Sequence, residues 1–248
     1  MTWSYSRIKC FENCQYQWFL KYIKLYSDSP KQFYASFGSL VHKILADFLS
    51  GKTSKEESKI GFLTRYYQEV AGERPDISIV KNYFNDTLNF LERFDGFPDF
   101  NTKEIEDEIR FKIDKYKFVG FIDYLGRDAD GFVIVDHKSR KLKPKSNRKT
   151  PTVNDKTIDD MYKQLYIYSE GVNLKYGEYP HQLCFNCYRN QNFIKEPFDA
   201  QKCEDAKNWA IDTIERIKNT DYFAPSVDYF KCKYICDVNE ECCYWQER

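Results

Sequence analysis

The sequence lacks a net charge, a long apolar run and a secretory leader. It contains 38 basic and 38 acidic residues among 248, so no overall field attracts it to nucleic acid, and any site for a polyanion must be local. No apolar run approaches the length that a bilayer requires, and Trp3, Tyr5 and Arg7 interrupt the start of the chain. We therefore expect a soluble protein of the cytoplasm that has no membrane partner.

Aromatic residues and cysteines, in contrast, are plentiful. Aromatics make up 18% and hydrophobics 42% of the residues, which is typical of a folded chain with a large core and excludes a disordered one. Nine cysteines without a secretory leader favour metal ligands over a disulfide framework. Four of them lie within the last seventeen residues, so we expect a metal site near that end.

A predicted β-hairpin carries the main functional signal. Two apolar runs, at 118–125 and 132–135, flank the turn-forming sequence Arg-Asp-Ala-Asp-Gly. Asp123 interrupts the first run, and Asp136 and Lys138 follow the second. Because side chains alternate along a strand, Asp136 and Lys138 point to one side, and pairing across the turn allows Asp123 to share that side.

Two carboxylates beside a lysine suit phosphodiester hydrolysis with a divalent metal. Carboxylate oxygens hold Mg²⁺ or Mn²⁺, the ion lowers the pKa of water, and the lysine stabilises developing negative charge. The alternative is a salt-bridged strand end, and on its own the hairpin favours neither interpretation. Glu106 or Glu108, on an expected half-exposed strand, is a weaker candidate for a third carboxylate.

Helical patterns on both sides of the hairpin add polar residues that share a face. Gly38 and His42 are one turn apart and share a helix face. The glycine allows another backbone to approach closely, and the histidine can face whatever approaches. The alternative is a hydrogen-bonded histidine on a core helix. Gln164 and Tyr168 are likewise one turn apart on a helix predicted over 157–176. Other helices are predicted over 4–24, 55–70, 77–95 and 200–219, and the helix that carries Gly38 and His42 begins at 37 and is ended by Gly51. The predicted strands cover 104–113, 116–125, 131–138 and 182–189.

A nearly continuous basic segment follows the hairpin. It contains Pro144 and little that is apolar, which predicts a mobile loop. Such loops are commonly only solvated, but this one leaves the strand end that carries Asp136 and Lys138, where cations could hold phosphates. The candidates for nucleic-acid binding are Arg140, Lys141, Lys143 and Lys145.

The C-terminal cysteines form a second signal. Cys232, Cys236 and Cys242 lie at short spacing and could supply three of the four ligands of one soft metal centre. Cys14, on the first helix, is the leading candidate for the fourth, and the metal would then close a loop of more than two hundred residues. Free thiols are the alternative, and the ligand type leaves both zinc and [4Fe-4S] open.

These motifs, in this order, resemble a known family over nearly the whole chain. Gly38-x-x-x-His42, Gly120-Phe-Ile-Asp123, Asp136-His-Lys138 and Gln164-x-x-x-Tyr168 resemble the successive motifs of RecB-like nucleases in the PD-(D/E)XK superfamily. The Ser-x-Ser-Arg-Ile opening with Cys14 and the terminal cysteines is similar to its iron–sulfur branch. That branch includes CRISPR-associated exonucleases, nuclease domains of AddB-type helicase–nucleases and stand-alone phage exonucleases.

The resemblance implies an α/β fold in which a restriction-endonuclease-like mixed β-sheet core is flanked by helices. A single nuclease domain would span 1–248. Within it, an iron–sulfur module would comprise 1–30 and 220–248, a helical insert 52–100 and a catalytic core 101–200.

The resemblance also implies roles for individual residues. The ligands of Mn²⁺ or Mg²⁺ would be His42, Asp123, Asp136 and the main-chain carbonyl of His137. The catalytic lysine would be Lys138, with Gln164 and Tyr168 positioning DNA or the site itself. A [4Fe-4S] cluster would be held by Cys14, Cys232, Cys236 and Cys242. Three residues separate Cys232 from Cys236 where many relatives have two, and Cys243 adjoins Cys242, so Cys242 and Cys243 compete for the last position.

The implied function is a metal-dependent DNA exonuclease that acts at single-stranded ends in phage or prokaryotic recombination, repair or CRISPR adaptation. Its partners would be DNA and a helicase, recombinase or CRISPR adaptation protein, in a prokaryotic cell or a phage-infected host. Manganese is the first choice of metal, because a histidine among carboxylates makes a site less suited to Mg²⁺ alone. The rival interpretations are a non-catalytic iron–sulfur subunit that binds DNA and a zinc-stabilised interaction protein.

Overall fold

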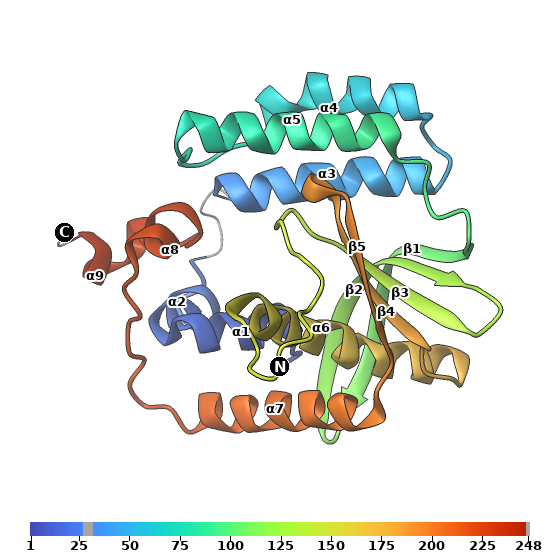
Figure 1. The fold of residues 1–248 in the computed structure, drawn as a ribbon. Coiled ribbons are helices and arrows are strands. Elements are labelled where there is room, and N and C mark those ends of the chain that lie inside the picture. Colours follow the sequence, from blue (N-terminus) through green and yellow to red (C-terminus); the bar gives the residue numbers. More distant parts are fainter. Residues whose placement is uncertain (27–31, 247–248) are drawn as a thin grey trace.

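A five-stranded mixed sheet forms the centre of the computed structural model, which describes residues 1–26 and 32–246 (Figure 1). The strands lie in the order β1-β2-β3-β4-β5, and all neighbours are antiparallel except β3 and β4. A parallel pair needs a crossover connection, which α6 (Val153–Tyr176) supplies. The strands are β1 (Asn101–Ile113), β2 (Tyr116–Arg127), β3 (Phe132–His137), β4 (Gln182–Cys187) and β5 (Asn192–Pro197).

Both faces of the central strands are buried. Leu125 and Ile134, which pair across β2 and β3, belong to the large core that includes residues of α6 and α7 (Ala200–Lys218). Tyr124 and Val135, the next pair, belong to a smaller core on the other face. A strand that is covered on both faces reads as a continuous apolar run, and β3 does so until Asp136.

A layer of three helices lies against one side of this sheet (Figure 1). They are α3 (Phe33–Leu49), α4 (Lys55–Glu69) and α5 (Ile77–Arg93). A capping box of Ser54 and Glu57 begins α4, and the Asp76 carboxylate caps α5. An aromatic core holds the three helices together, while α3 also contacts β1 and β2. The buried rings of this core include Phe33, Phe37, Phe62, Tyr66 and Phe90.

The N-terminal segment forms two helices where one was predicted over 4–24. They are α1 (Tyr5–Asn13) and α2 (Gln15–Tyr22), and the break between them is Cys14, whose backbone is extended. The Cys14 Sγ accepts a hydrogen bond from the Gln17 amide at 3.4 Å, so this cysteine caps α2. Ser4 caps α1 by accepting a hydrogen bond from the Arg7 amide at 3.2 Å. Leaving the helix frees the Cys14 sulfur to face the C-terminal segment.

The two ends of the chain meet beside α2. The C-terminal segment contains α8 (Tyr229–Tyr234), the short η2 (Asn239–Glu241) and α9 (Cys243–Gln246). Asp237 accepts a hydrogen bond from Gln17 Nε2 at 3.0 Å and pairs with Lys21. The rings of Tyr16 and Tyr244 also meet edge to face, with centroids 4.8 Å apart. The predicted module at 1–30 and 220–248 extends at 27–30 and 247–248 beyond the described residues.

The basic segment after the hairpin is anchored, which corrects the prediction of a mobile loop. Leu142 is buried, and its carbonyl accepts hydrogen bonds from the Asn190 and Asn192 side chains, each at 2.7 Å. Ser146 donates through its amide and its hydroxyl to the Asp155 carboxylate at 2.8 and 2.7 Å. Asp155, nine residues further along the chain, holds the loop against α6, and Asn190 and Asn192 hold it against the β4–β5 turn. The composition of the loop did not reveal these partners.

The sequence also missed β5. Its residues, Asn-Phe-Ile-Lys-Glu-Pro, contain no apolar run because an edge strand pairs on one side only. The turn that precedes it, η1 (Tyr188–Asn190), ends at Gln191 in the left-handed region, with φ at 52°. Within residues 1–26 and 32–246, no helix has the length and hydropathy needed to cross a bilayer.

Candidate active site

Two carboxylates lie side by side where the β2–β3 ladder ends. The last ladder pair is Tyr124 with Val135, so Asp123 and Asp136 occupy the next facing positions, and both are buried. Beyond that pair, Asp123 Oδ2 accepts a hydrogen bond from the amide of His137 at 2.7 Å. The carboxylate thus replaces a strand carbonyl as the partner of this amide, which fixes its orientation at the sheet edge.

His42 approaches the same carboxylate from α3. Its Nδ1 lies 3.3 Å from Asp123 Oδ1, and its Nε2 lies 3.0 Å from the main-chain carbonyl oxygen of His137. Both ring nitrogens therefore face acceptors, which favours the doubly protonated imidazolium. Burial lowers the pKa of His42, but the negative charge and hydrogen bond of Asp123 outweigh it and raise the pKa to about 9. One turn earlier, Gly38 has open space where a side chain would stand.

Lys138 connects the second carboxylate to α6. Its Nζ lies 2.7 Å from Asp136 Oδ2 and donates to Gln164 Oε1 at 3.0 Å. Gln164 Nε2 in turn donates to the Tyr168 hydroxyl at 3.3 Å. Burial raises the pKa of Asp136 to about 6, although the positive charge of Lys138 opposes that rise. The four side chains form one polar chain from the sheet edge to the helix.

Tyr168 packs against a glycine of β2. A Cβ added to Gly120 would lie 2.5 Å from Tyr168 Cε1, so only glycine lets the ring sit there. Burial raises the pKa of Tyr168 to about 12, which keeps its hydroxyl neutral. The glycine and tyrosine motifs, separated by nearly fifty residues, therefore form a single contact.

Glu106 adds a third carboxylate near the first two. Ligand atoms of His42, Glu106 and Asp123 all lie within 4.8 Å of one another. The Glu106 backbone has φ at 52°, the left-handed region that side chains other than glycine rarely adopt. Partial desolvation and the negative charge of Asp123 raise the pKa of Glu106, although the residue is exposed. Glu108, the other weak candidate, forms an ion pair with Arg110 at 2.5 Å, so of the two only Glu106 faces the site.

These residues line a groove of about 860 Å³ between α3, α4 and the sheet edge. The donor atoms that converge there suit a divalent ion: an imidazole nitrogen, carboxylate oxygens and a main-chain carbonyl oxygen. Sequence reasoning missed several of the lining residues, because the packing of α3 against the sheet and of α4 against α3 brings them to the groove. They include Lys43, Lys52, Arg65 and Phe121.

The ring of His137 points away from the groove, as strand alternation predicts. It stacks on Phe97, with ring planes 11° apart and centroids separated by 6.1 Å, and its Nδ1 lies 3.0 Å from Asn186 Nδ2. Burial lowers the pKa of His137 to about 4, so the ring is neutral at physiological pH. This ring also meets the His42 ring edge to face, with centroids 5.8 Å apart, while the main-chain carbonyl of His137 contacts His42 Nε2.

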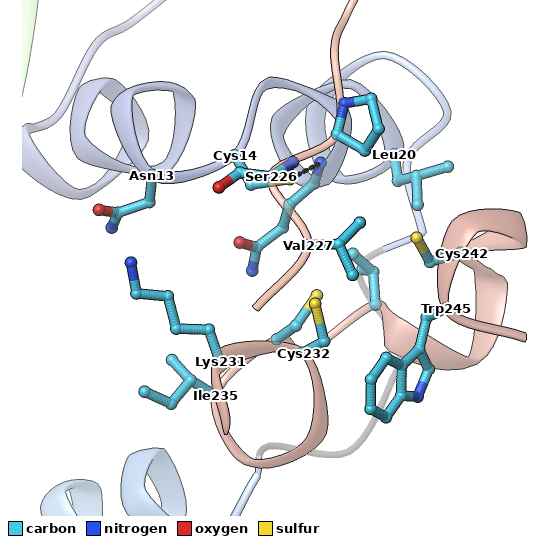
Figure 2. A pocket seen from close by; sticks show the side chains of 14 residues that line it. Asn13, Cys14, Leu20, Ser226, Val227, Lys231, Cys232, Ile235, Cys242 and Trp245 are labelled. Carbon is cyan, nitrogen blue, oxygen red and sulfur yellow. Dashed lines mark hydrogen bonds between the residues drawn. The ribbon is translucent and has the colours of Figure 1, made fainter. Parts of the chain in front are cut away.

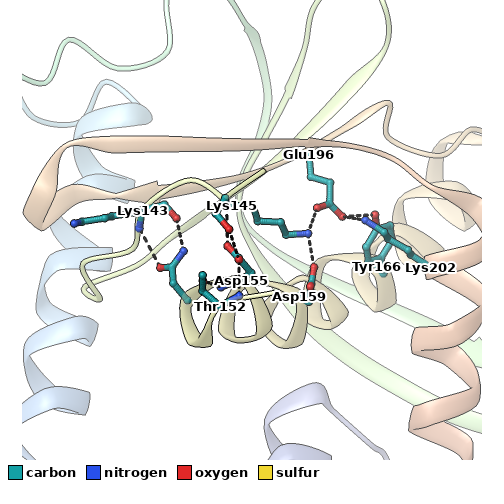
Figure 3. Close-up of polar contacts among 10 residues, drawn as sticks. Lys143, Lys145, Thr152, Asp155, Asp159, Tyr166, Glu196 and Lys202 are labelled. Atoms are coloured by element: carbon teal, nitrogen blue, oxygen red, sulfur yellow. Dashed lines mark hydrogen bonds and ion pairs between the residues drawn. The ribbon is translucent and has the colours of Figure 1, made fainter. Parts of the chain in front are cut away.

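The four cations of the basic loop lie outside the residues that line the groove. Lys145 Nζ pairs with Asp159 and, at 2.6 Å, with Glu196 (Figure 3). Lys141 pairs with Asp86 at 2.8 Å, and the Lys143 amide donates to the Asn154 side chain at 3.3 Å. Carboxylates therefore already neutralise two of the predicted phosphate-binding cations. The roles of Arg140, Lys141, Lys143 and Lys145 in phosphate binding stay predictions.

The cysteines of the two chain ends line a second pocket, of about 130 Å³ (Figure 2). Cys14 Sγ accepts hydrogen bonds from the amides of Gln17 and Ser226, both at 3.4 Å. Burial raises the pKa of the Cys236 thiol to about 12. Cys243 does not line the pocket; it is exposed and lies 3.5 Å from the Tyr16 hydroxyl. The four cysteines that line it are Cys14, Cys232, Cys236 and Cys242.

The fold and the groove define a metal-binding hydrolase whose domain mixes α-helices and a β-sheet. Residues 2–243 match the model of the PD-(D/E)XK nuclease superfamily, so the chain belongs to this superfamily, as the sequence motifs predicted. Nucleases of this superfamily use divalent metal ions, and the mixed sheet with flanking helices fits their restriction-endonuclease-like fold.

A solved structure shares the fold. It is the crystal structure of a protein from Eubacterium rectale named "Putative exonuclease", with a TM-score of 0.53 and 14% sequence identity. The match covers 96% of this chain and 90% of that chain. At this identity the likeness concerns the fold alone. No curated protein matches the sequence.

Proposed function

We propose that this nuclease is a metal-dependent DNA exonuclease that cleaves at single-stranded ends, with Mn²⁺ as the preferred ion and Mg²⁺ as the alternative. The observation that carries the proposal is the convergence of His42, Asp123, Asp136 and Lys138 at one edge of the sheet, inside one groove. The name of the structural neighbour from Eubacterium rectale supports the exonuclease class.

The ion would be held by His42, Asp123, Asp136 and the His137 carbonyl. A divalent ion at this place supplies positive charge for the phosphate and acidifies a water molecule. Both ring nitrogens of His42 now face oxygen atoms and carry protons. His42 must lose one of these protons to bind the ion, because only an unprotonated ring nitrogen can act as a ligand. The hydrogen bond from the His137 amide keeps Asp123 oriented before an ion arrives.

Lys138 is the residue that would act on the reacting phosphate. Its ammonium group, held between Asp136 and Gln164, can donate to the attacking water or to a phosphate oxygen as negative charge develops. Tyr168 fixes the side-chain amide of Gln164, so the amide oxygen faces Lys138 and not the solvent. Gln164 and Tyr168 are thus positioning residues.

The experiment measures release of nucleotides from end-labelled single and double strands by anaerobically purified protein, with Mn²⁺ or Mg²⁺. We expect progressive shortening of single strands and its loss in Asp136→Ala. Asp212→Ala, an exposed carboxylate on α7, is the matched control and should retain activity. Equal cleavage by Asp136→Ala and wild type would refute the proposed site. DNA binding without cleavage by the wild type would instead support the non-catalytic subunit.

We also propose that Cys14, Cys232, Cys236 and Cys242 hold a [4Fe-4S] cluster. Among the described residues, no three cysteine sulfurs lie within 4.8 Å of one another. A single zinc ion with Zn–S bonds of about 2.3 Å would draw its sulfurs to about 3.8 Å. A cubane cluster spaces its ligands more widely and suits an apolar pocket with amide donors near the sulfurs. Anaerobic protein should be brown and contain iron and sulfide; colourless protein with zinc would refute the cluster.

The biological setting follows from these proposals. Attack at single-stranded ends suits phage or prokaryotic recombination, repair or CRISPR adaptation, in the cytoplasm of a prokaryotic cell or a phage-infected host. A helicase, a recombinase or a CRISPR adaptation protein would supply such ends. Comparing activity with and without a candidate partner, on duplexes that it unwinds, tests this setting.

A further inference from the structure

The groove also has a basic wall, formed by two lysines. Lys43, next to His42 on α3, and Lys52, beyond the end of α3, both line it. Their side chains are 63% and 71% exposed, and their ion pairs are long, at 3.5 Å to Glu69 and 3.6 Å to Asp47. Exposed pairs of this kind contribute little, so both ammonium groups are available to an anion.

Phe121 is an exposed aromatic residue in the same groove. It precedes Asp123 by two positions on β2 and therefore shares its face. The side chain is 52% exposed, although Gly120 and Ile122 on either side are buried. Because those neighbours are buried, the strand fixes the backbone of Phe121 while its ring faces the solvent. A single exposed aromatic ring is common on protein surfaces, but this one lines the groove beside Asp123, where a ligand bound in the groove would contact it.

We propose that Phe121 stacks on a base of a single DNA strand whose phosphates lie against Lys43 and Lys52. This inference rests on the proposed function and identifies how the same groove holds its substrate. The two features together match a single strand, which combines a polyanionic backbone with flat apolar bases. A base within a duplex is stacked on both sides, so its face is not available to the ring. Stacking thus makes the groove selective for unpaired DNA.

Stacking places a base next to the proposed metal ligands. The nucleotide on Phe121 would adjoin the phosphate that faces Asp123 and Lys138, so the ring sets the position of the chain relative to the bond that breaks. Phe121 is then a positioning residue, and it tolerates any base because every base has a flat face. The lysines contribute affinity that is independent of sequence.

The binding test uses fluorescence anisotropy of a labelled single-stranded oligonucleotide. All proteins carry Lys138→Ala, which the proposed function predicts to be inactive, so that binding is measured without cleavage. We expect Phe121→Ala to weaken binding about 5- to 150-fold, the range for one base–aromatic stack, and Phe121→Trp to retain it. Tyr67→Ala, at an exposed tyrosine of α4 outside the groove lining, should change nothing.

An abasic site moved along the oligonucleotide locates the stacked base. We expect the protein with Phe121 to lose affinity when one particular base is removed, and the Phe121→Ala protein to be insensitive at that position. Equal affinity of both proteins for the intact strand, or equal sensitivity to every abasic position, would overturn the proposal. Equal weakening of binding to a relaxed, covalently closed circular duplex would also overturn it, because such a duplex has neither an unpaired base nor an exposed terminal base pair.

The lysines are tested by salt dependence. For single strands, removing one phosphate-binding cation should lower the slope of log K against log salt by about 0.7. We therefore expect that reduction in Lys43→Ala and again in Lys52→Ala. An unchanged slope in both variants would remove the basic wall from the proposal.

A kinetic test separates this inference from the proposed function. Phe121→Ala in the otherwise native protein should lower kcat/KM on single-stranded DNA but not on bis(p-nitrophenyl) phosphate, a phosphodiester without bases. Equal rates for Phe121→Ala and wild type on DNA would refute the stacking role while leaving the nuclease intact. Full activity of Lys138→Ala on both substrates would refute the proposed active site, whatever the effect of Phe121.

Discussion

The groove and the cysteine pocket hold reactive groups in opposite ways. In the groove, opposite charges from different elements already neutralise one another, as His42 does with Asp123 and Lys138 with Asp136. In the cysteine pocket the sulfurs lie among apolar side chains, and burial raises the pKa of Cys236 to about 12. Charged groups are therefore preorganised in the groove, whereas in the pocket the Cys236 thiolate forms only if a bound cation stabilises it.

The two regions also differ in where their residues come from. The groove joins α3, neighbouring strands and α6, so the central sheet supports it. The cysteine pocket joins the first and last segments of the chain, which meet through Asp237 and Tyr16. We infer that the groove depends on the core of the fold, while the pocket depends on its ligand to hold the ends together. The following predictions test that contrast, from the largest expected effect to the smallest.

Replacing Lys138 by alanine tests the groove alone. We expect the cleavage rate to fall by about 10²- to 10³-fold, because a charged donor aimed at the phosphate is lost. Initial rates on labelled single strands measure this, with iron content as a second readout that should not change. Lys112→Ala, an exposed lysine of β1, is the control. A wild-type rate in Lys138→Ala would show that this ammonium group is not used.

Replacing Cys242 tests the pocket alone. We expect Cys242→Ser to lose most of its iron, because this sulfur lines the pocket, and Cys243→Ser to keep it, because Cys243 faces solvent. Iron and sulfide analysis of anaerobic protein measures the difference. The thermal stability of Cys242→Ser should fall with the iron. Loss of iron in Cys243→Ser alone would identify that residue as the last ligand.

Metal binding to the groove should depend on pH. The pKa of His42 is raised to about 9, so near neutral pH the ion must displace its proton, and the affinity for Mn²⁺ should rise about tenfold per pH unit up to pH 9. Below about pH 6 the slope should steepen, because Asp136, whose pKa is about 6, is then protonated too. Calorimetric titration in buffers of different ionisation enthalpy measures the protons released. An affinity that is independent of pH would exclude His42 as a ligand.

Gly120→Ala tests the contact between β2 and α6. Its Cβ would clash with Tyr168 at 2.5 Å, so we expect a loss of about 1–3 kcal/mol in the free energy of unfolding, typical of overpacking. Gly61→Ala, on α4 with nothing within 4 Å, is the control and should gain about 0.5–1 kcal/mol. Urea unfolding measures both. Unchanged stability in Gly120→Ala would show that Tyr168 moves freely.

Much of the fold was predictable from patterns that are local in sequence. Strand alternation placed Asp136 and Lys138 on one side and the His137 ring on the other, and helical spacing paired Gln164 with Tyr168. Such predictions fail where specific contacts of single side chains decide the outcome. The basic loop was predicted to be mobile, but Asn190 and Asp155 anchor it. The N-terminal helix was predicted to be continuous, but Cys14 breaks it.

The sequence by itself determined the family, the hairpin with its carboxylates and the gathering of cysteines near the ends, because each depends on residue type and short spacing. Only the tertiary structure decided that Glu106 turns toward His42, that Phe121 stays exposed in the groove and that Lys43 lines it. These positions arise where α3 crosses the edge of the sheet. The side chains that α3 covers at the sheet edge depend on the packing of elements that are far apart in the chain. A local sequence pattern carries no information about that packing.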